Sequence, residues 1–257
     1  MILLYFLVGF TATLLGALTG IGGGVIIKPI LDTMGTYDAG TVSTLSAATV
    51  FAMAAISLLK KKRSEMELNW RVSLLLAAGS IVGGMIGKSV FNQLLTQMTS
   101  DDITVIQSTL LIGMLALVLL NSIKRFSSYH VTFPFLILMV GLTLGALSGF
   151  LGIGGGPLNV AILMVIFSMD IKSSAINSIL IIFFSQLSTL VTIFLTTGYG
   201  LFDLSMIAYM IGGGLLGGYM GTIFSPKIAR RQINTLFNIT LVIIIMMNIY
   251  TITRVMI

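Results

Sequence analysis

The sequence predicts an all-α, polytopic membrane protein made of two inverted-topology repeats. Each repeat is expected to hold about five transmembrane or half-membrane helices, with glycine-broken helical hairpins. Three observations predict this fold: long continuous apolar runs, a GIGGG pentapeptide that occurs twice, and corresponding loops of opposite charge. We place the first repeat at 1–127 and the second at 128–257.

The composition excludes a water-soluble domain. Of the 257 residues, 56% are hydrophobic and 9% are charged, whereas soluble domains carry about 25% charged residues. The apolar runs continue for about twenty residues, so they fit membrane-spanning helices rather than the alternating strands of a barrel. The net charge of +6 comes from short basic clusters between these runs, a pattern typical of topology signals. We therefore expect a lipid bilayer around the chain and no nucleic-acid partner.

The chain divides into ten apolar segments, at 2–19, 24–34, 40–59, 70–91, 104–122, 131–150, 156–168, 173–196, 204–224 and 233–253. Residues 1–20 lack a basic leader and a small-residue cleavage site, so we expect a first span there. The second and seventh segments are short, and each begins at a GIGGG cluster. These two segments are therefore the expected half-membrane helices.

Basic clusters between the segments predict the orientation, because Lys and Arg concentrate in cytoplasmic loops. They are Lys60–Arg63, then Lys124 and Arg125, then Lys227, Arg230 and Arg231. The acidic loop at 92–103 then lies outside. An odd number of crossings is needed between 124 and 198, so the short segment 156–168 must take part in one. We expect a multi-pass protein of the cell membrane with both termini on the extracytoplasmic side.

The two halves match one another at an offset of 132 residues. GIGGG at 20–24 falls on GIGGG at 152–156, and Asp38 falls on Asp170. Inverted repeats with glycine-interrupted segments at matching places are typical of secondary transporters. Two further glycine rows have four-residue spacing, which predicts close helix packing: Gly79, Gly83, Gly84 and Gly87, and Gly213, Gly217, Gly218 and Gly221.

Each GIGGG cluster predicts a turn followed by a helix start. The first amides of a helix have no intrahelical partner, and together with the helix dipole they favour an anion. Tight helix packing is the alternative explanation for so many glycines. Two such turns approaching from opposite membrane sides would form one anion site near the repeat interface.

Polar residues of the spans complete the candidate site. Asn159 lies on the first turn after the second cluster, where it could instead bond a neighbouring helix. Lys28 could add charge to the site, snorkel to the surface, or pair with Asp32. The candidate substrate-binding residues are Gly22, Gly23, Gly24, Lys28, Ser46, Gly154, Gly155, Gly156, Asn159, Asn177, Ser178 and Gln186.

Other charged residues are expected to be anchors or solvated. Lys88 is expected near the outer interface, with its ammonium snorkelling to the surface, and Arg71 at the cytoplasmic interface. The carboxylates all lie near segment ends, so no proton relay is expected within a span. The sequence has no cysteine and no zinc-binding HExxH motif, so we expect no metal, no cofactor and no catalytic residues.

The chain resembles the TauE/SafE family of sulfite and organosulfonate exporters. The resemblance rests on GIGGGVIIKPIL at 20–31, GIGGGPLNVAIL at 152–163 and SSAINSILIIFFSQLSTL at 173–190. It implies an exporter of small sulfur oxyanions such as sulfite, thiosulfate or organosulfonates. One departure is Ala161, which stands where the first copy has Pro29, so the two short helices are expected to differ.

Two other functions stay open at this stage. An anion channel of the same fold would use the glycine turns as a filter, and a transporter could instead carry another small carboxylate or oxyanion. An intramembrane aspartyl protease is disfavoured, because Tyr37-Asp38 has no matching second motif. The expected partner is a small anionic substrate, and the sequence leaves a homodimer open.

Overall fold

The computed structural model describes residues 2–60, 70–124 and 133–256, and within these ranges it contains helices and short connections without strands. The described helices are α1 Ile2–Thr19, α2 Gly24–Met34, α3 Ala39–Lys60, α4 Trp70–Leu95, α5 Ser100–Lys124, α6 Pro134–Leu151, α7 Gly156–Ile166, α8 Ile171–Thr196, α9 Ile207–Phe224, the short 3₁₀ helix η2 Ser225–Lys227, and α10 Arg230–Met256. The all-α, polytopic fold class is confirmed. Each expected segment corresponds to one α-helix, with ends that differ by a few residues.

The matched aspartates of the two halves explain where two helices begin. Asp38 accepts hydrogen bonds from the amides of Gly40 at 2.8 Å and Thr41 at 3.0 Å. Asp170 accepts in the same way from Lys172 and Ser173. Burial alone raises the pKa of Asp170, but hydrogen bonds from Ser173 and Lys172 and the charge of Arg230 hold it below its ordinary value. Both carboxylates therefore act as helix N-caps.

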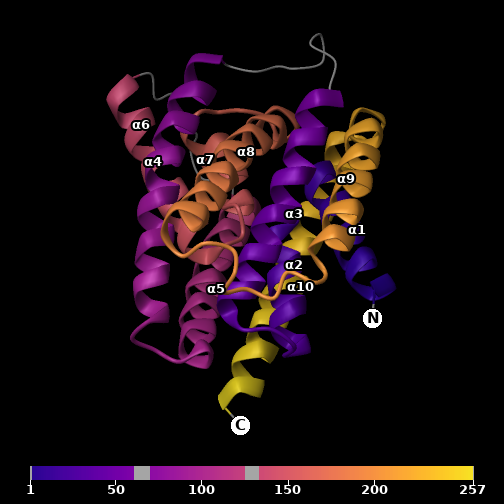
Figure 1. The fold of residues 1–257 in the computed structure, drawn as a ribbon. Coiled ribbons are helices and arrows are strands. Elements are labelled where there is room, and N and C mark those ends of the chain that lie inside the picture. Colours follow the sequence, from indigo (N-terminus) through magenta and orange to yellow (C-terminus); the bar gives the residue numbers. More distant parts are fainter. Residues whose placement is uncertain (1, 61–69, 125–132, 257) are drawn as a thin grey trace.

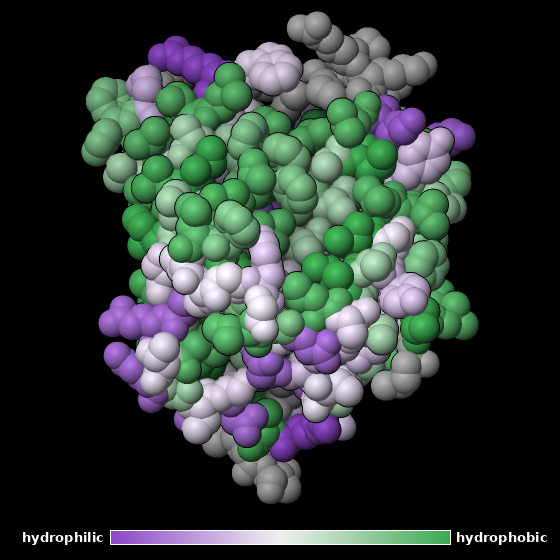
Figure 2. Space-filling view, in the orientation of Figure 1, coloured by the Kyte–Doolittle hydropathy of each residue, from purple (hydrophilic) through white to green (hydrophobic). Residues whose placement is uncertain are grey.

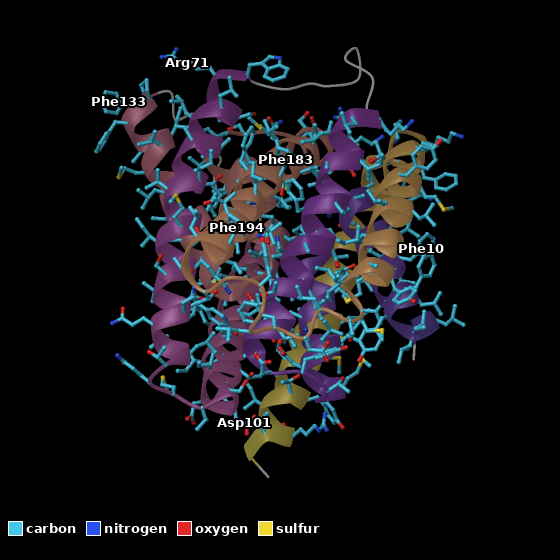
Figure 3. All side chains as sticks on the ribbon, viewed as in Figure 1. Phe10, Arg71, Asp101, Phe133, Phe183 and Phe194 are labelled. Carbon is cyan, nitrogen blue, oxygen red and sulfur yellow. The ribbon has the colours of Figure 1, made fainter. Side chains whose placement is uncertain are left out.

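Eight of the described helices are long and apolar enough to cross a membrane, and α7 is a shorter apolar helix. Figure 2 shows a broad hydrophobic belt around the visible face, with hydrophilic residues gathered toward the lower end. Figure 3 places Arg71 at the upper end and Asp101 at the lower end of the molecule. The charges that the sequence assigned to opposite sides are thus at opposite ends.

Helices of the first half pack mainly against helices of the second half (Figure 1). The helix α1 packs along α9, and its counterpart α6 packs along α4. Likewise, α3 packs against α9, and its counterpart α8 packs against α4. The helix α5 packs against its own counterpart, α10. This pattern is compatible with the predicted inverted repeats. The predicted boundary between them, at 127 and 128, lies outside the described residues.

Two glycine rows make these pairings close. Three glycines of each row lie against the backbone of the partner helix: Gly79, Gly83 and Gly87 on α4 meet α6, and Gly213, Gly217 and Gly221 on α9 meet α1. The remaining two, Gly84 and Gly218, face α8 and α3. A methyl group on Gly83 would overlap the Leu142 carbonyl oxygen. The interpretation of these rows as packing surfaces is confirmed.

Figure 1 places both chain ends in the lower half of the molecule, opposite to the end where α3 finishes and α4 begins. Lys60, at that upper end, has its ammonium 5.4 Å from the Tyr219 ring near the end of α9. The side that faces the cytoplasm stays a prediction from the basic clusters. Of these, Lys61, Lys62, Arg63 and Arg125 lie outside the described residues.

Replacing one glycine of the α4 row tests this packing. Gly83→Leu forces α4 away from the α6 backbone and should cost about 3 kcal/mol, lowering the melting temperature in detergent by roughly 6–12 °C. The matched control is Gly113→Leu on α5, because nothing lies within 4 Å of a Cβ at Gly113. Equal melting temperatures for the two variants would contradict the packing role.

Candidate functional site

The two GIGGG turns lie directly against each other. A Cβ on Gly24 would lie 2.5 Å from the carbonyl oxygen of Ile153 in the other turn. The reciprocal contact is closer still, because a Cβ on Gly156 would overlap the Ile21 carbonyl. Only glycine fits at these two positions. The two copies of GIGGG therefore contact each other where the two halves meet.

The backbone of the turns needs glycine for a second reason. Gly20 and Gly22 in the first turn have φ of 76° and 73°, and Gly152 and Gly154 in the second have 66° and 82°. Other residues pay about 1–2 kcal/mol each for this left-handed conformation. The turns differ at one place: Gly155 has φ of 68°, whereas its counterpart Gly23 is right-handed. The sequence predicted that the two short helices differ. The structure shows a difference already at the residue before each helix, at the end of the GIGGG turn.

Both short helices start without a side-chain cap. Neither Gly23 before α2 nor Gly155 before α7 offers a side chain to the first amides. Pro157 occupies the first turn of α7, where its missing N–H is not needed. Uncapped helix starts present donors and a partial positive charge. Both starts lie where the halves meet, and this arrangement suits an anion.

A group of buried amides and hydroxyls, here called the amide cluster, lies beside the second turn. It consists of Ser148, Asn159, Ser185 and Gln186. The Ser185 hydroxyl donates to Ser148 Oγ at 2.8 Å, and Gln186 Nε2 donates to the same oxygen at 3.2 Å. A Cβ on Gly154 would lie 3.4 Å from Gln186 Nε2. The cluster therefore borders the turn directly.

The amide cluster has unused hydrogen-bonding capacity. Asn159 Oδ1 and Gln186 Oε1 are both buried, and neither has a hydrogen-bond partner. Leaving a buried polar atom unpaired costs about 1–3 kcal/mol. A terminal amide has two donors and an acceptor, and by rotating it can turn either side toward a ligand. These two amides, whose oxygens have no partner, are therefore suited to bind a polar ligand.

The matched serines Ser46 and Ser178 have different environments. Ser178 Oγ lies 2.7 Å from the Gly20 carbonyl oxygen and 3.4 Å from that of Gly156, so one hydroxyl ties both turns together. Ser46 Oγ is buried without a hydrogen-bond partner. The Ser178 hydroxyl thus links the two turns, whereas the Ser46 hydroxyl has no hydrogen-bond partner.

The structure does not bring Asn177 to the turns. Its Nδ2 donates to the Ser173 carbonyl at 2.7 Å, and its Oδ1 accepts from the Ser73 hydroxyl of α4. Residues 177 and 178 are neighbours on α8, so their side chains leave the helix in different directions. Asn177 joins α8 to α4 rather than facing the site.

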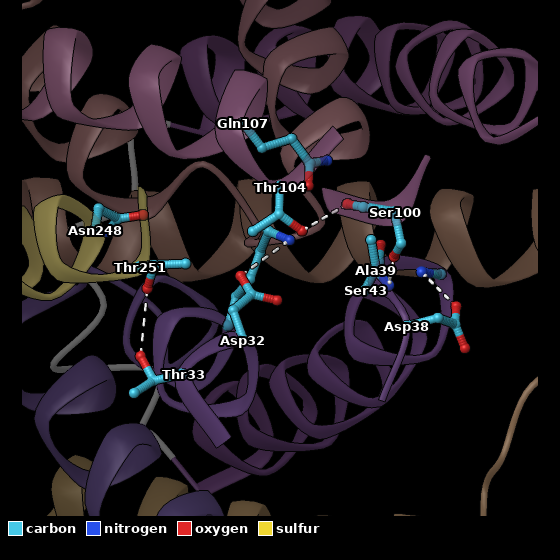
Figure 4. A network of polar contacts seen from close by, with 12 residues as sticks. Asp32, Thr33, Asp38, Ala39, Ser43, Ser100, Thr104, Gln107, Asn248 and Thr251 are labelled. Carbon is cyan, nitrogen blue, oxygen red and sulfur yellow. Dashed lines mark hydrogen bonds and ion pairs between the residues drawn. The ribbon is translucent and has the colours of Figure 1, made fainter. Parts of the chain in front are cut away.

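Charged residues form a second buried group, here called the lysine cluster: Lys28, Asp32 and Lys88. Lys28 Nζ lies 3.5 Å from Asp32 Oδ2, and both side chains are 4% exposed. Lys28 therefore pairs with Asp32 and does not snorkel. Asp32 lies near the end of α2 as expected, yet it is buried because α2 packs against α3 and α10. Figure 4 shows Asp32 among polar residues of α2, α3, α5 and α10.

The prediction that Lys88 snorkels is wrong. Its side chain is fully buried, with Nζ 3.4 Å from Ser43 Oγ of α3 and 4.2 Å from the centre of the Phe91 ring. The physical reason is that the glycine row of α4 draws this part of the helix against α6, so the lysine packs inward. Ser43 in turn contacts Gly152 at the start of the second turn.

A small pocket lies between the halves at the end that carries Lys60 and Lys227. Its lining comes from α1, α3, α8, α9 and η2, and includes Ala17, Ser57, Ala175, Ile179, Thr222 and Ser225. Ala175 of this lining contacts Gly20 in the first turn. The pocket, about 10 Å³ in volume, is near the size of one water molecule and borders the first turn through Ala175.

Several residues of the site were missed from the sequence. Ser185 adjoins Gln186, and Ser148 lies four residues before Gly152, so helical spacing from known candidates could have identified both. Burial of Lys88 had no such signal, because it depends on how α4 meets α6. The Asp32 carboxylate could have been weighed more heavily, since a lysine one turn away already offered a partner.

Removing the hydroxyl that ties the turns should destabilise the protein. Ser178→Ala leaves the Gly20 carbonyl without its partner, so we expect a loss of about 1–3 kcal/mol in unfolding free energy. Ser46→Ala is the matched control and should stay within about 0.5 kcal/mol, since its hydroxyl has no partner to lose. Thermal unfolding in detergent measures both. A neutral Ser178→Ala would show that the tie contributes nothing.

Comparisons with known proteins identify relatives of this chain and its family. A probable membrane transporter protein of Methanocaldococcus jannaschii is 30% identical over 175 residues, which cover 62% of this chain and 60% of that protein's length. A probable membrane transporter protein of Xylella fastidiosa is 26% identical over 256 residues, covering 96% of this chain and 92% of that protein. No solved structure matches the chain. The family model described as sulfite exporter TauE/SafE matches residues 5–247, so this multi-pass membrane protein belongs to the TauE/SafE family.

Proposed function

We propose that the protein is a secondary transporter that exports small sulfur-containing oxyanions, such as sulfite, thiosulfate or organosulfonates. The observation that carries this proposal is the meeting of two uncapped helix starts beside two buried amides, Asn159 and Gln186, whose hydrogen-bonding capacity is only partly used. The anion binds at the paired GIGGG turns between the halves. Family membership supports transport of this substrate class.

The chemistry around the turns suits an oxyanion. Sulfite, thiosulfate and sulfonates present several oxygens around one sulfur, and each oxygen accepts hydrogen bonds. The first amides of α2 and α7 supply donors from two directions, and Asn159 and Gln186 add side-chain amides. Neutral donors of this kind hold an anion without the large desolvation cost of a full ion pair.

The way the halves pack favours alternating access. The turns belong to different halves, and the helices around them pair across the same boundary. Rocking one half against the other would therefore open the site to one membrane side at a time. The pocket at the basic end, with Ala17 and Ala175 in its wall, provides an approach to the site from that side.

The contact between the turns favours a carrier over a channel. Gly24 and Gly156 lie against backbone of the opposite turn, which leaves no straight opening between the two glycine positions. A filter would need the turns to stand apart. Transport by a carrier saturates with substrate concentration, and this property separates the two functions experimentally.

A flux assay in proteoliposomes tests the proposal. We expect saturable movement of sulfite, thiosulfate or methanesulfonate, abolished by Gly155→Leu and by Gly23→Leu. Leucine at Gly155 would strain a left-handed residue, and at Gly23 it would meet Thr13 at 2.8 Å. Gly200→Leu is the control, because a Cβ there has open space around it.

Three results of this assay would count against the proposal. Flux retained in either turn variant would indicate that the glycines serve close packing and do not form the anion site. Flux that rises without saturation would indicate a channel. No movement of any small anion by the wild-type protein would refute the proposed substrate class.

The amide cluster gives a separate prediction. Gln186→Leu removes a side-chain amide beside Gly154, so we expect at least a tenfold loss of apparent affinity for the transported anion, equal to about 1.4 kcal/mol. Thr192→Val on the same helix is the matched control, because the Thr192 hydroxyl bonds only its own helix, at the Ser188 carbonyl. Equal affinities for both variants would remove Gln186 from the site.

A further inference from the structure

The lysine cluster contains more positive than negative charge. Lys28 and Lys88 are 3% and 0% exposed, and the Asp32 side chain is 4% exposed. These are two buried ammonium groups and one buried carboxylate. Asp38, the other acidic residue nearby, is exposed at the start of α3. With all three groups ionised, the buried cluster within the described residues has a net charge of +1.

Lys88 is the residue whose charge is not balanced. The ion pairs of the described chain are Lys28 with Asp32 and Arg230 with Asp170, so Lys88 has none. Its ammonium contacts only a serine hydroxyl at 3.4 Å and the face of the Phe91 ring at 4.2 Å. Both contacts are dipolar, and neither cancels a full charge. A buried unpaired charge is unfavourable and usually marks a functional site.

Polar atoms without partners surround the same region. Lys28 Nζ makes no hydrogen bond, although it lies in ion-pair distance of Asp32. Gln107 of α5 donates through Nε2 to the Phe150 carbonyl, while its buried Oε1 has no partner. The Phe150 ring packs edge-on against Phe91, under the Lys88 ammonium. The Lys28 ammonium has N–H groups beyond its ion pair with Asp32, and these are a second, independent sign that the cluster can hold an anion.

The lysine cluster adjoins the paired turns. Lys28 lies on α2, four residues after Gly24. Lys88 reaches the other turn through Ser43, whose hydroxyl contacts Gly152. The cluster therefore borders the proposed anion site on the side of α2, α3 and α4.

The charge occurs in one half only. The second half has Val160 at the position that matches Lys28, and Met164 at the position that matches Asp32. Thr222, which matches Lys88 in the register of the glycine rows, bonds its own helix at the Gly218 carbonyl. The charged lysine cluster therefore comes from helices of the first half, and the neutral amide cluster comes from helices of the second half.

We propose that the lysine cluster makes the transport site selective for singly charged anions. This inference rests on the proposed function, and it names the charge of the substrate. One monoanion brings the buried cluster to neutrality, with Lys88 as its counter-ion. A dianion leaves one buried negative charge uncompensated, and a neutral molecule leaves Lys88 unpaired. Organosulfonates and hydrogen sulfite fit this charge, whereas sulfate does not; thiosulfate, also a dianion, is then the least favoured of the proposed substrates.

Binding to the wild-type protein tests the inference directly. Methanesulfonate and sulfate are both tetrahedral around sulfur, and at neutral pH they differ by one negative charge. Isothermal titration of the purified full-length protein in detergent should give at least tenfold tighter binding for methanesulfonate. Equal or tighter binding of sulfate would overturn the inference without any variant.

Charge variants test which residues set the preference. Lys88→Met removes the unbalanced charge and should weaken methanesulfonate binding at least tenfold. Asp32→Asn raises the buried charge to +2 and should shift the preference at least tenfold toward sulfate. Lys227→Met at the exposed surface is the control and should leave both affinities unchanged.

The outcomes separate this inference from the proposed function. Should wild-type protein neither bind nor move any small anion, both are wrong. Should anions bind and move with no charge preference, or should Asp32→Asn leave the preference unchanged, the inference alone is wrong. Where Lys88→Met does not fold, the wild-type preference and Asp32→Asn decide the question.

Discussion

The backbone contact between the two GIGGG turns is the constraint on which the rest of the structure depends. Gly24 and Gly156 each lie against a carbonyl of the opposite turn, where no side chain fits. This contact fixes the ends of α1 and α6 and the starts of α2 and α7 at one place between the halves. Ser178 secures it with a hydroxyl that reaches both turns. The uncapped starts of α2 and α7 therefore lie close together where the halves meet.

The helices around this contact hold it in place through close backbone packing. Glycine rows on α4 and α9 let these helices approach α6 and α1 at backbone distance. The polar groups left near the turns then divide by charge. Neutral amides with unused hydrogen-bonding capacity come from helices of the second half, and the lysine cluster comes from helices of the first half. Such a centre can combine hydrogen bonding to oxyanion oxygens with selection by charge.

The sequence predicted the helices well because apolar runs and glycine breaks are local signals. Asp38 and Asp170, matched across the halves, cap equivalent helices, and the glycine rows pack as their spacing indicated. Side-chain direction was harder to predict. Asn177 and Ser178 are neighbours, yet only Ser178 reaches the turns. Burial of Lys88 depends on how α4 packs against α6 and α8, which are distant in sequence, so the residue was expected at the surface.

The central claim is that an anion binds between the paired turns, and the position of a heavy oxyanion tests it most directly. Selenite has the shape and charge of sulfite, and its selenium can be located by anomalous diffraction from soaked crystals of the full-length protein. If the anion binds there, the selenium peak lies within hydrogen-bonding reach of the first amides of α2 or α7 and of the Asn159 or Gln186 amide. A peak only at the molecular surface, or none at a concentration that saturates transport, would contradict it.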